Sequence, residues 1–343
     1  MLSKPDLKDS EIVRCLREAY GLDVASMSFL PIGADFSTAV YKVTTHKGAE
    51  YFLKLRSGEF LEASVSVPKY WVDLGIKQVI PPIPTTTGQL WVDLGISTAS
   101  FKAIVYPYVE GRNGVEAKLS SNQWAQFGAA IKKLHDTDIP FPVTKNVPRE
   151  TFSSKWRDAV SAFLIRIEDE LCIDPIAAKT ATFLKAKSVE ILTTIDRIEC
   201  LASSLQKQAL SYVLCHADLH GWNLLIDKKA ELYIVDWDTL IFAPKERDLM
   251  FMGAGIWDSG LTPDEEETLF YQGYDQVGVN QDAISYYRGE RIIQDICEYC
   301  EHIFLSNERD RDRLQSFEYL QSNFLPNGTL GRAFKPYNVN AVK

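Results

Sequence analysis

The sequence lacks any long apolar run. No stretch of its 343 residues approaches the ~20 consecutive apolar residues that a membrane-spanning helix needs. The beginning, MLSKPDLKDSEIVRCLREAY, has no apolar segment after its charges, unlike a secretory signal peptide. We therefore expect a cytoplasmic protein that does not associate with membranes. Its six scattered cysteines are then expected to be reduced thiols.

The sequence also lacks an excess of positive charge. It has 46 acidic residues against 37 Lys and Arg, a formal net charge of −9. Nucleic-acid binding requires a basic face, so we expect no nucleic-acid partner. The charge is compatible with a cationic ligand, although net charge is a weak indicator of function. The length favours two domains or two lobes.

A glycine-rich phosphate loop is missing from the N-terminal part. The segment LPIGADFSTAVY (30–41) has a single glycine and matches neither G-x-G-x-x-G nor G-x-x-x-x-G-K-[ST]. Backbone N–H groups between Asp35 and Thr38, including Ser37, are candidates for contacts with phosphates. Taken alone, the segment is equally typical of an ordinary hairpin turn.

The pattern of apolar residues changes near residues 107–111. Alternating β-rich runs precede this point, and helical periodicity dominates after it. We expect an α+β, two-lobed protein-kinase-like fold with a small β-rich N-terminal lobe (1–108) and a larger, mainly helical C-terminal lobe (109–343). Helices are predicted over 9–20, 120–137, most of 152–210 and 284–304, and a hairpin over 37–56.

One stretch, VLCHADLHGWNLLID (213–227), carries the pattern H-x-D-x-x-x-x-N. In kinase catalytic loops the Asp orients or accepts the proton of the substrate hydroxyl and the Asn binds Mg²⁺, which predicts these roles for Asp218 and Asn223. In the following segment YIVDWD, Asp236 comes directly after strand-like residues, at a strand end where kinases place a metal-binding Asp. A capped turn is the alternative for Asp218 alone, but the three residues together favour catalysis. His216 is expected to shape the loop, and His220 has no predicted role.

Lys54 lies within the apolar strand-like segment YFLKL. A lysine there is a candidate for binding the α- and β-phosphates of ATP, although solvated strand lysines are common. Because a buried lysine needs a partner, Glu62 is the predicted partner, on a helical segment that Pro68 is expected to shorten or kink.

These motifs together resemble the aminoglycoside phosphotransferase family, whose members are small-molecule kinases with a protein-kinase-like fold. CHADLHGWNLL resembles the family's catalytic loop and IVDWD its metal-binding strand end. YPYVEG, with Tyr106 and Tyr108, resembles the hinge whose backbone meets adenine. APKERDLMF (243–251) and SYYRGERIIQDI (285–296) are similar to the branch that acts on spectinomycin. The resemblance implies ATP- and Mg²⁺-dependent O-phosphorylation of that antibiotic, and hence resistance.

The chain departs from protein kinases in two respects. Asp238 stands where the D-x-G motif has glycine, and the short spacing to Asp248 leaves no room for an activation loop. The second departure argues against a protein substrate. A kinase of choline, homoserine, methylthioribose or fructosamine would show the same motifs, and a non-catalytic nucleotide-binding regulator is a further alternative. The oligomeric state stays open.

A cationic acceptor needs carboxylates near the reacting hydroxyl. On the predicted helix 284–304, Asp295 lies at the edge of the apolar stripe, whereas Glu301 points away from it. Asp295 is therefore a candidate acceptor ligand, with an i,i+4 pair to Arg291 as an equal alternative. Asp248 is expected either to line the acceptor pocket or, as we favour, to brace the catalytic loop.

Overall fold

The computed structural model describes residues 4–33, 37–96, 99–169, 174–275, 278–306, 310–325 and 328–335. The chain divides into two compact units, each assembled from separate stretches. Unit 1 comprises Met1–Ala117, Thr137–Val147 and Gly221–Leu240, and unit 2 comprises Lys118–Asp136, Pro148–His220 and Ile241–Lys343. Among the described helices, none combines the length and apolar character that crossing a bilayer requires. The proposed division at residues 108/109 stays a prediction.

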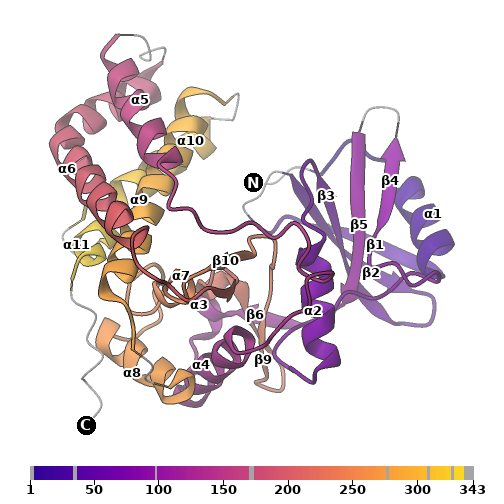
Figure 1. Cartoon of the computed structure of the whole chain (residues 1–343). Helices are drawn as coiled ribbons and strands as arrows, with labels where there is room; N and C mark the ends of the chain where they lie inside the picture. Colours follow the sequence, from indigo (N-terminus) through magenta and orange to yellow (C-terminus); the bar gives the residue numbers. More distant parts are fainter. Residues whose placement is uncertain are drawn as a thin grey trace. The chain divides into compact units, whose positions relative to one another are not determined.

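Unit 1 contains a five-stranded antiparallel sheet (Figure 1). Its strands, in spatial order, are β1 (Val24–Leu30), β2 (Thr38–Thr45), β3 (Glu50–Ser57), β5 (Ala99–Pro107) and β4 (Val92–Ile96). The hairpin predicted over 37–56 is confirmed as β2 and β3. Helix α1 (Asp9–Tyr20) ends at Gly21, which has the left-handed φ of 66° that glycine adopts readily.

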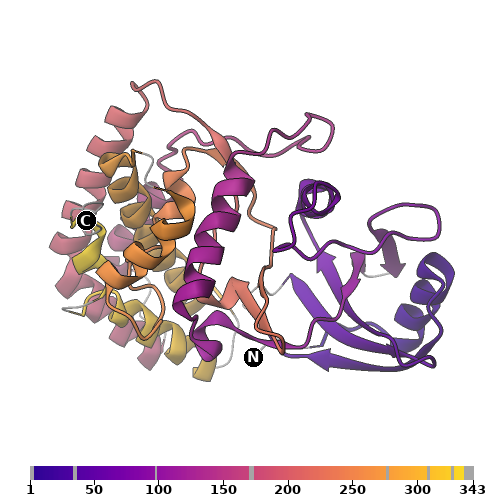
Figure 2. The same ribbon diagram turned by 90° about the horizontal axis from the view of Figure 1, so that it is seen from below.

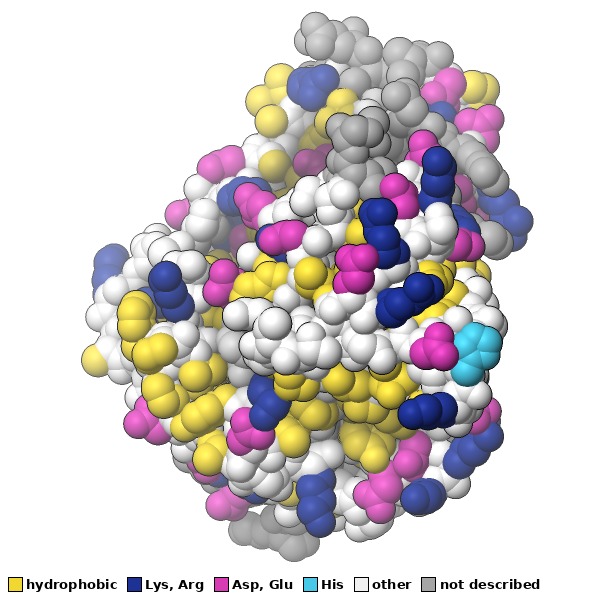
Figure 3. Space-filling view, turned by 90° about the vertical axis from the view of Figure 1, so that its right-hand side faces the viewer, with side chains coloured by type: hydrophobic (Ala, Val, Ile, Leu, Met, Phe, Trp, Pro, Cys, Tyr) yellow, Lys and Arg dark blue, Asp and Glu magenta, His cyan; other side chains and the backbone are white. Residues whose placement is uncertain are grey.

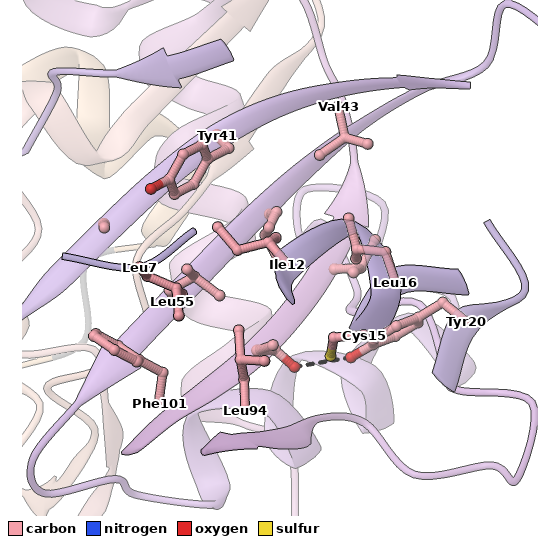
Figure 4. Packing of buried hydrophobic residues seen from close by; sticks show 14 residues of the cluster. Leu7, Ile12, Cys15, Leu16, Tyr20, Tyr41, Val43, Leu55, Leu94 and Phe101 are labelled. Carbon is pink, nitrogen blue, oxygen red and sulfur yellow. Dashed lines mark hydrogen bonds between the residues drawn. The ribbon is translucent and has the colours of Figure 1, made fainter. Parts of the chain in front are cut away.

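One face of this sheet packs on α1 (Figure 4). Ile12 and Leu16 of α1 are buried against strand residues that include Val43 and Leu55. The Tyr20 hydroxyl donates a 2.9 Å hydrogen bond to the carbonyl of Ala103. Since side chains alternate along a strand, burial of Leu53 and Leu55 on this face directs Lys54 and Arg56 to the opposite one.

Helix α2 (Ala63–Asp73) lies on the other side of the sheet from α1 in Figure 1. It begins after Glu62 and continues through Pro68, so the proline does not end it. An interior proline costs the helix a hydrogen bond, but Val65, Val67 and Trp71 are completely buried. Packing of these side chains compensates for the helix-breaking tendency that the local sequence indicated.

A second sheet of unit 1 fixes the position of Asp236. It contains β6 (Gly111–Asn113), β8 (Leu224–Asp227) and β9 (Leu232–Ile234) in that order; the short helices α3 (Gly114–Ala117) and η1 (Gly221–Asn223) adjoin it. Ile234 at the end of β9 donates a 2.7 Å hydrogen bond to the carbonyl of Gln78 and bridges to Val79. The chain that enters Asp236 is therefore held by backbone bonds.

Unit 2 is mainly helical, and several of its helices run side by side (Figure 2). Its elements are α4 (Ser121–His135), α5 (Lys155–Asp169), α6 (Pro175–Leu205), β7 (Val213–Cys215), β10 (Ile241–Ala243), α7 (Glu246–Leu249), α8 (Pro263–Tyr274), α9 (Gln281–Phe304), α10 (Asp310–Ser322) and α11 (Thr329–Ala333). The predicted class, a β-rich N-terminal part followed by a mainly helical C-terminal part, is confirmed. Cys297 and Cys300 are buried on α9.

Helices α4 and α8 cross closely because glycines lie at their contact. A Cβ added to Gly128 would fall 2.0 Å from the carbonyl oxygen of Phe270, and one on Gly273 would fall 1.8 Å from that of Ala125. A capping box starts α4: the Ser120 hydroxyl accepts from the Gln123 N–H, and the Gln123 side chain accepts from the Ser120 N–H. This close crossing positions His135, at the end of α4, and Tyr274, at the end of α8.

Figure 3 shows the charge distribution on one molecular face. Lys and Arg side chains lie interspersed with Asp and Glu side chains there, and hydrophobic side chains gather between them. Charged side chains of both signs are therefore mixed on this face.

Candidate active site

The loop after β7 is held by the carboxylate of Asp248. The backbone N–H of His216 donates to Asp248 Oδ2 at 2.9 Å, and that of Ala217 donates to Oδ1 at 2.6 Å. Ala217 adopts a left-handed φ of 68°, which is costly for a residue with a Cβ and needs such external support. His216 accepts from the Asp218 N–H at 3.2 Å through Nδ1. This geometry favours bracing of the loop by Asp248 over direct contact with an acceptor.

A buried histidine supports Asp248 from behind. His135 Nε2 lies 2.9 Å from Asp248 Oδ2, and His135 Nδ1 lies 2.8 Å from the Tyr274 hydroxyl. A carboxylate only accepts, so Nε2–H donates to Asp248, and Nδ1 forms the hydrogen bond with the Tyr274 hydroxyl. Burial alone would raise the pKa of Asp248, but hydrogen bonds from His135 and from the Ala217 N–H lower it.

Both oxygens of Asp218 have cationic or hydrogen-bonding partners within unit 2. Arg291 Nη1 on α9 donates to Asp218 Oδ1 at 2.8 Å, and His220 Nε2 lies 3.1 Å from Oδ2. Burial opposes ionisation of Asp218, but the His220 hydrogen bond and the Arg291 charge outweigh it and hold the pKa below the usual range. Asp218 is thus held in place on both oxygens, and its role as the catalytic residue stays a prediction. His220, which had no predicted role, contacts Asp218 directly.

Asp295 shares the same guanidinium. Arg291 Nε donates to Asp295 Oδ1 at 2.9 Å, which is the i,i+4 pair that the sequence left open. Burial raises the pKa of Asp295 to about 6 despite the Arg291 charge. Arg291 therefore joins Asp218 and Asp295, while Glu301 on the same helix is exposed, as expected.

In unit 1, Lys54 binds two carboxylates. Its Nζ lies 2.9 Å from Asp236 Oδ1 and 2.7 Å from Asp238 Oδ2. Burial by itself would lower the pKa of Lys54, but the two Asp charges raise it above its usual value. Among the described residues these two, rather than Glu62, pair with Lys54, so the predicted Lys54–Glu62 pair is absent.

Asn223 and Asp236 occupy linked backbone positions in unit 1. The Val235 N–H donates to the carbonyl of Asn223 at 3.0 Å, which joins η1 to the segment that carries Asp236. Asn223 is buried, whereas the Asp236 side chain is 52% exposed and its φ is 65°. An amide oxygen and a carboxylate are hard donors, which Mg²⁺ prefers together with phosphate oxygens and water. The donor chemistry of these residues therefore fits a magnesium ion.

The other predicted nucleotide residues also belong to unit 1. Tyr106 pairs with Phe52 across β5 and β3, and the Tyr108 N–H donates to the Glu50 carbonyl at 3.4 Å. Ser37 accepts from the Ser57 N–H at 2.8 Å, and Thr38 begins β2. Asp35 lies outside the described residues. Glu62 immediately precedes α2. Roles in nucleotide binding for these residues stay predictions.

Four further residues around the site were missed or undervalued at the sequence level. These are Arg56, Asp238, Arg291 and His135. Arg56 carried a signal, since it lies two positions after Lys54 and therefore on the same face of β3. The partners of His135 and Arg291 are far away in sequence, so their contacts depend on the tertiary fold.

Comparison with known proteins identifies the family. The model of the phosphotransferase enzyme family (APH) matches residues 28–278. Spectinomycin phosphotransferase APH(9)-Ia, solved with ADP and spectinomycin, is 34% identical with a TM-score of 0.86 and covers 96% of this chain and 98% of that chain. Its AMP-bound complex is 33% identical with a TM-score of 0.83 and the same coverage.

A more distant structure shares the fold alone. Choline kinase LicA from Streptococcus pneumoniae is 17% identical with a TM-score of 0.56, and the match covers 94% of this chain and 98% of that chain. A comparison with curated proteins found no match. The family model, which matches most of the chain, and the 34% identity over nearly its full length agree. The chain therefore belongs to the phosphotransferase enzyme family and is a kinase.

Proposed function

We propose that this kinase transfers the γ-phosphate of ATP to a hydroxyl group of spectinomycin or a closely related aminocyclitol. The observation that carries the proposal is the 34% identity, over 96% of the chain, to a phosphotransferase solved with ADP and spectinomycin. The carboxylates of Asp218 and Asp295, which both bind one guanidinium, suit a cationic acceptor. Resistance to the antibiotic is the expected consequence in a cell.

In the proposed reaction, Asp218 accepts a hydrogen bond from the acceptor hydroxyl and orients its oxygen. The oxygen forms a bond to the γ-phosphorus while the bond to the β–γ bridging oxygen breaks, so ADP leaves and the hydroxyl proton is released. Because the transition state is loose, strong proton abstraction is not required, and an Asp with a lowered pKa is adequate. Catalysis depends on positioning and on charge stabilisation.

We assign the nucleotide side to residues of unit 1. Lys54 would bind the phosphates, and the segment around Tyr106 and Tyr108 would contact adenine through its backbone. Asn223 and Asp236 would hold Mg²⁺, which would neutralise phosphate charge when bound. Asp248, through its hydrogen bonds to the loop N–H groups, keeps Asp218 in place.

A product assay tests the proposal. Purified protein with ATP and Mg²⁺ is assayed against spectinomycin, choline, homoserine, methylthioribose and a fructosamine, with ADP release and ³¹P NMR of the product as readouts. We expect an O-phosphorylated product with spectinomycin. Turnover with one of the metabolites only would refute the acceptor assignment, and ATP binding without transfer to any acceptor would favour a regulator.

The variant Asp218→Asn tests the catalytic assignment separately. The amide retains the shape of the side chain but loses the negative charge, so turnover should fall by about 100-fold or more, while calorimetry should show ATP binding close to that of the wild type. Turnover at the wild-type rate in this variant would show that Asp218 is not the catalytic residue.

A further inference from the structure

Two cations of β3 converge on one carboxylate oxygen. Lys54 Nζ lies 2.7 Å and Arg56 Nη1 lies 2.9 Å from the same Oδ2 of Asp238. The Lys54, Arg56 and Asp238 side chains are 11%, 20% and 20% exposed. Two cations that both contact one oxygen atom repel each other strongly in a partly buried setting unless an anion lies between them. The structure therefore contains an anion-binding pair of cations, and Asp238 supplies the anion.

The Arg56 side chain is also tied to the first residue of β2. Its Nη1 donates to Thr38 Oγ1 at 3.2 Å. At the next position of β3, the Ser57 N–H and hydroxyl donate to the Ser37 carbonyl at 2.8 and 3.0 Å. The guanidinium is thus held beside Thr38, at the start of β2. The sequence LPIGADFSTAVY (30–41) has a single glycine, unlike glycine-rich phosphate loops.

We propose that Arg56 is a second phosphate-binding residue, which acts with Lys54 on the phosphate oxygens of the nucleotide. The inference rests on the proposed use of ATP and deepens it. A guanidinium forms strong, directional hydrogen bonds with phosphate oxygens. In the complex a phosphate oxygen takes the place of Asp238 Oδ2 between the two cations, and Arg56 compensates for the glycine-poor loop.

Nucleotide titrations of purified variants test this role without an acceptor. ATP, ADP and adenosine are titrated by calorimetry into the wild type, Arg56→Met, Arg56→Gln and Arg56→Lys, once with EDTA and once with Mg²⁺. Arg56→Met and Arg56→Gln should weaken ATP and ADP binding by about tenfold or more, as expected for loss of a charge-assisted hydrogen bond, and leave adenosine binding unchanged. Arg56→Lys should be intermediate. Arg17→Met, an exposed arginine of α1, is the matched control and should bind as the wild type.

The outcomes separate this inference from the proposed acceptor. Equal affinities of all variants for ADP would overturn the Arg56 assignment. Equal weakening of ADP binding and adenosine binding in both Arg56→Met and Arg56→Gln would also overturn it, because a general structural defect affects both ligands. Arg56→Gln retains hydrogen-bond donors for Thr38. It therefore distinguishes loss of a phosphate contact from a structural defect even if Arg56→Met unfolds. The wild type could bind ADP through Arg56 and still fail to phosphorylate spectinomycin. That result would support the inference and refute only the acceptor proposal.

Discussion

Replacing Arg291 by methionine removes one of the two groups, with His220, that hold the pKa of Asp218 below its usual range. Arg291 Nη1 lies 2.8 Å from Asp218 Oδ1, and both side chains are 23% exposed, so solvent screens the pair only in part. An opposite charge at this distance lowers a carboxyl pKa by about 1–3 units, equivalent to roughly 1.4–4 kcal/mol. We therefore expect the pKa of Asp218 to rise by about 1–3 units in Arg291→Met, because less positive charge then opposes the rise in pKa that burial causes.

The assay is a ¹³C-carboxylate NMR titration of the nucleotide-free protein, together with the pH profile of kcat/KM. In the variant, the acidic limb of the profile should move to higher pH, in parallel with the NMR pKa of Asp218. Arg291→Lys retains a charge without the planar fork that joins two carboxylates, so its shift should be smaller. Arg197→Met removes an exposed arginine of α6 and should change neither quantity. An unchanged Asp218 pKa in Arg291→Met would refute the reasoning, even if activity fell.

Stability should change with pH in the corresponding direction. The pKa of Asp218 is lower in the folded protein than the unfolded value of about 3.9. Its stabilising contribution is therefore complete above that unfolded value and disappears as the pH falls through the folded pKa. The difference in free energy of unfolding between wild type and Arg291→Met should be largest near neutral pH and should shrink in acid.

Three further predictions follow from other contacts. Asp248→Asn should lower the free energy of unfolding by about 3–5 kcal/mol in urea melts, because a buried, multiply bonded carboxylate loses its charge; a loss well below this range would contradict its bracing role. Gly128→Ala should lower the melting temperature through overpacking of about 1–3 kcal/mol or more against Phe270, whereas Gly95→Ala, with open space around its Cβ, should not. Because the pKa of Asp295 is about 6, the KM for a cationic acceptor should rise as the pH falls below that value; Asp295→Asn should abolish this dependence, and an unchanged pH dependence would exclude Asp295 from acceptor binding.

Motifs that act through local spacing could be read from the sequence. The pattern around Asp218 and Asn223, and the strand that leads to Asp236, led to a kinase and to its family, and both are confirmed. The apolar surroundings of Lys54 in YFLKL correctly indicated a buried lysine that needs a partner. The roles of these residues in the reaction stay predictions.

Long-range pairing explains what the sequence did not reveal. The partners of Lys54 come from residues 236 and 238 rather than from the nearby Glu62, because the hydrogen bond from Ile234 to Gln78 fixes where that segment lies. Similarly, nothing local marks His135 as the support of Asp248. At Pro68 the local sequence indicated a feature that the fold overrides. Complete burial of Trp71 and its neighbours outweighs the strong tendency of the proline to end the helix.

The discontinuous make-up of unit 1 has a consequence for synthesis on the ribosome. Arg112 of β6 pairs with Ile226 of β8, which lies far along the chain. At about 5–20 residues per second, the partner strand is made roughly 6–23 s after β6. During this interval most of the newly made chain belongs to unit 2, so β6 leaves the ribosome well before the strand that completes its sheet.

Translation therefore completes unit 1 only after residues 118–136 and 148–220 of unit 2 have been made. The five-stranded sheet can form from the first 107 residues, whereas Asn223 and Asp236 arrive only with the late segment Gly221–Leu240. A truncated product that stops before residue 221 would contain Lys54 and Arg56 without the carboxylates that pair with them. The metal-binding residues we propose would thus be added to the nascent protein after the phosphate-binding cations, as one of the last steps in building unit 1.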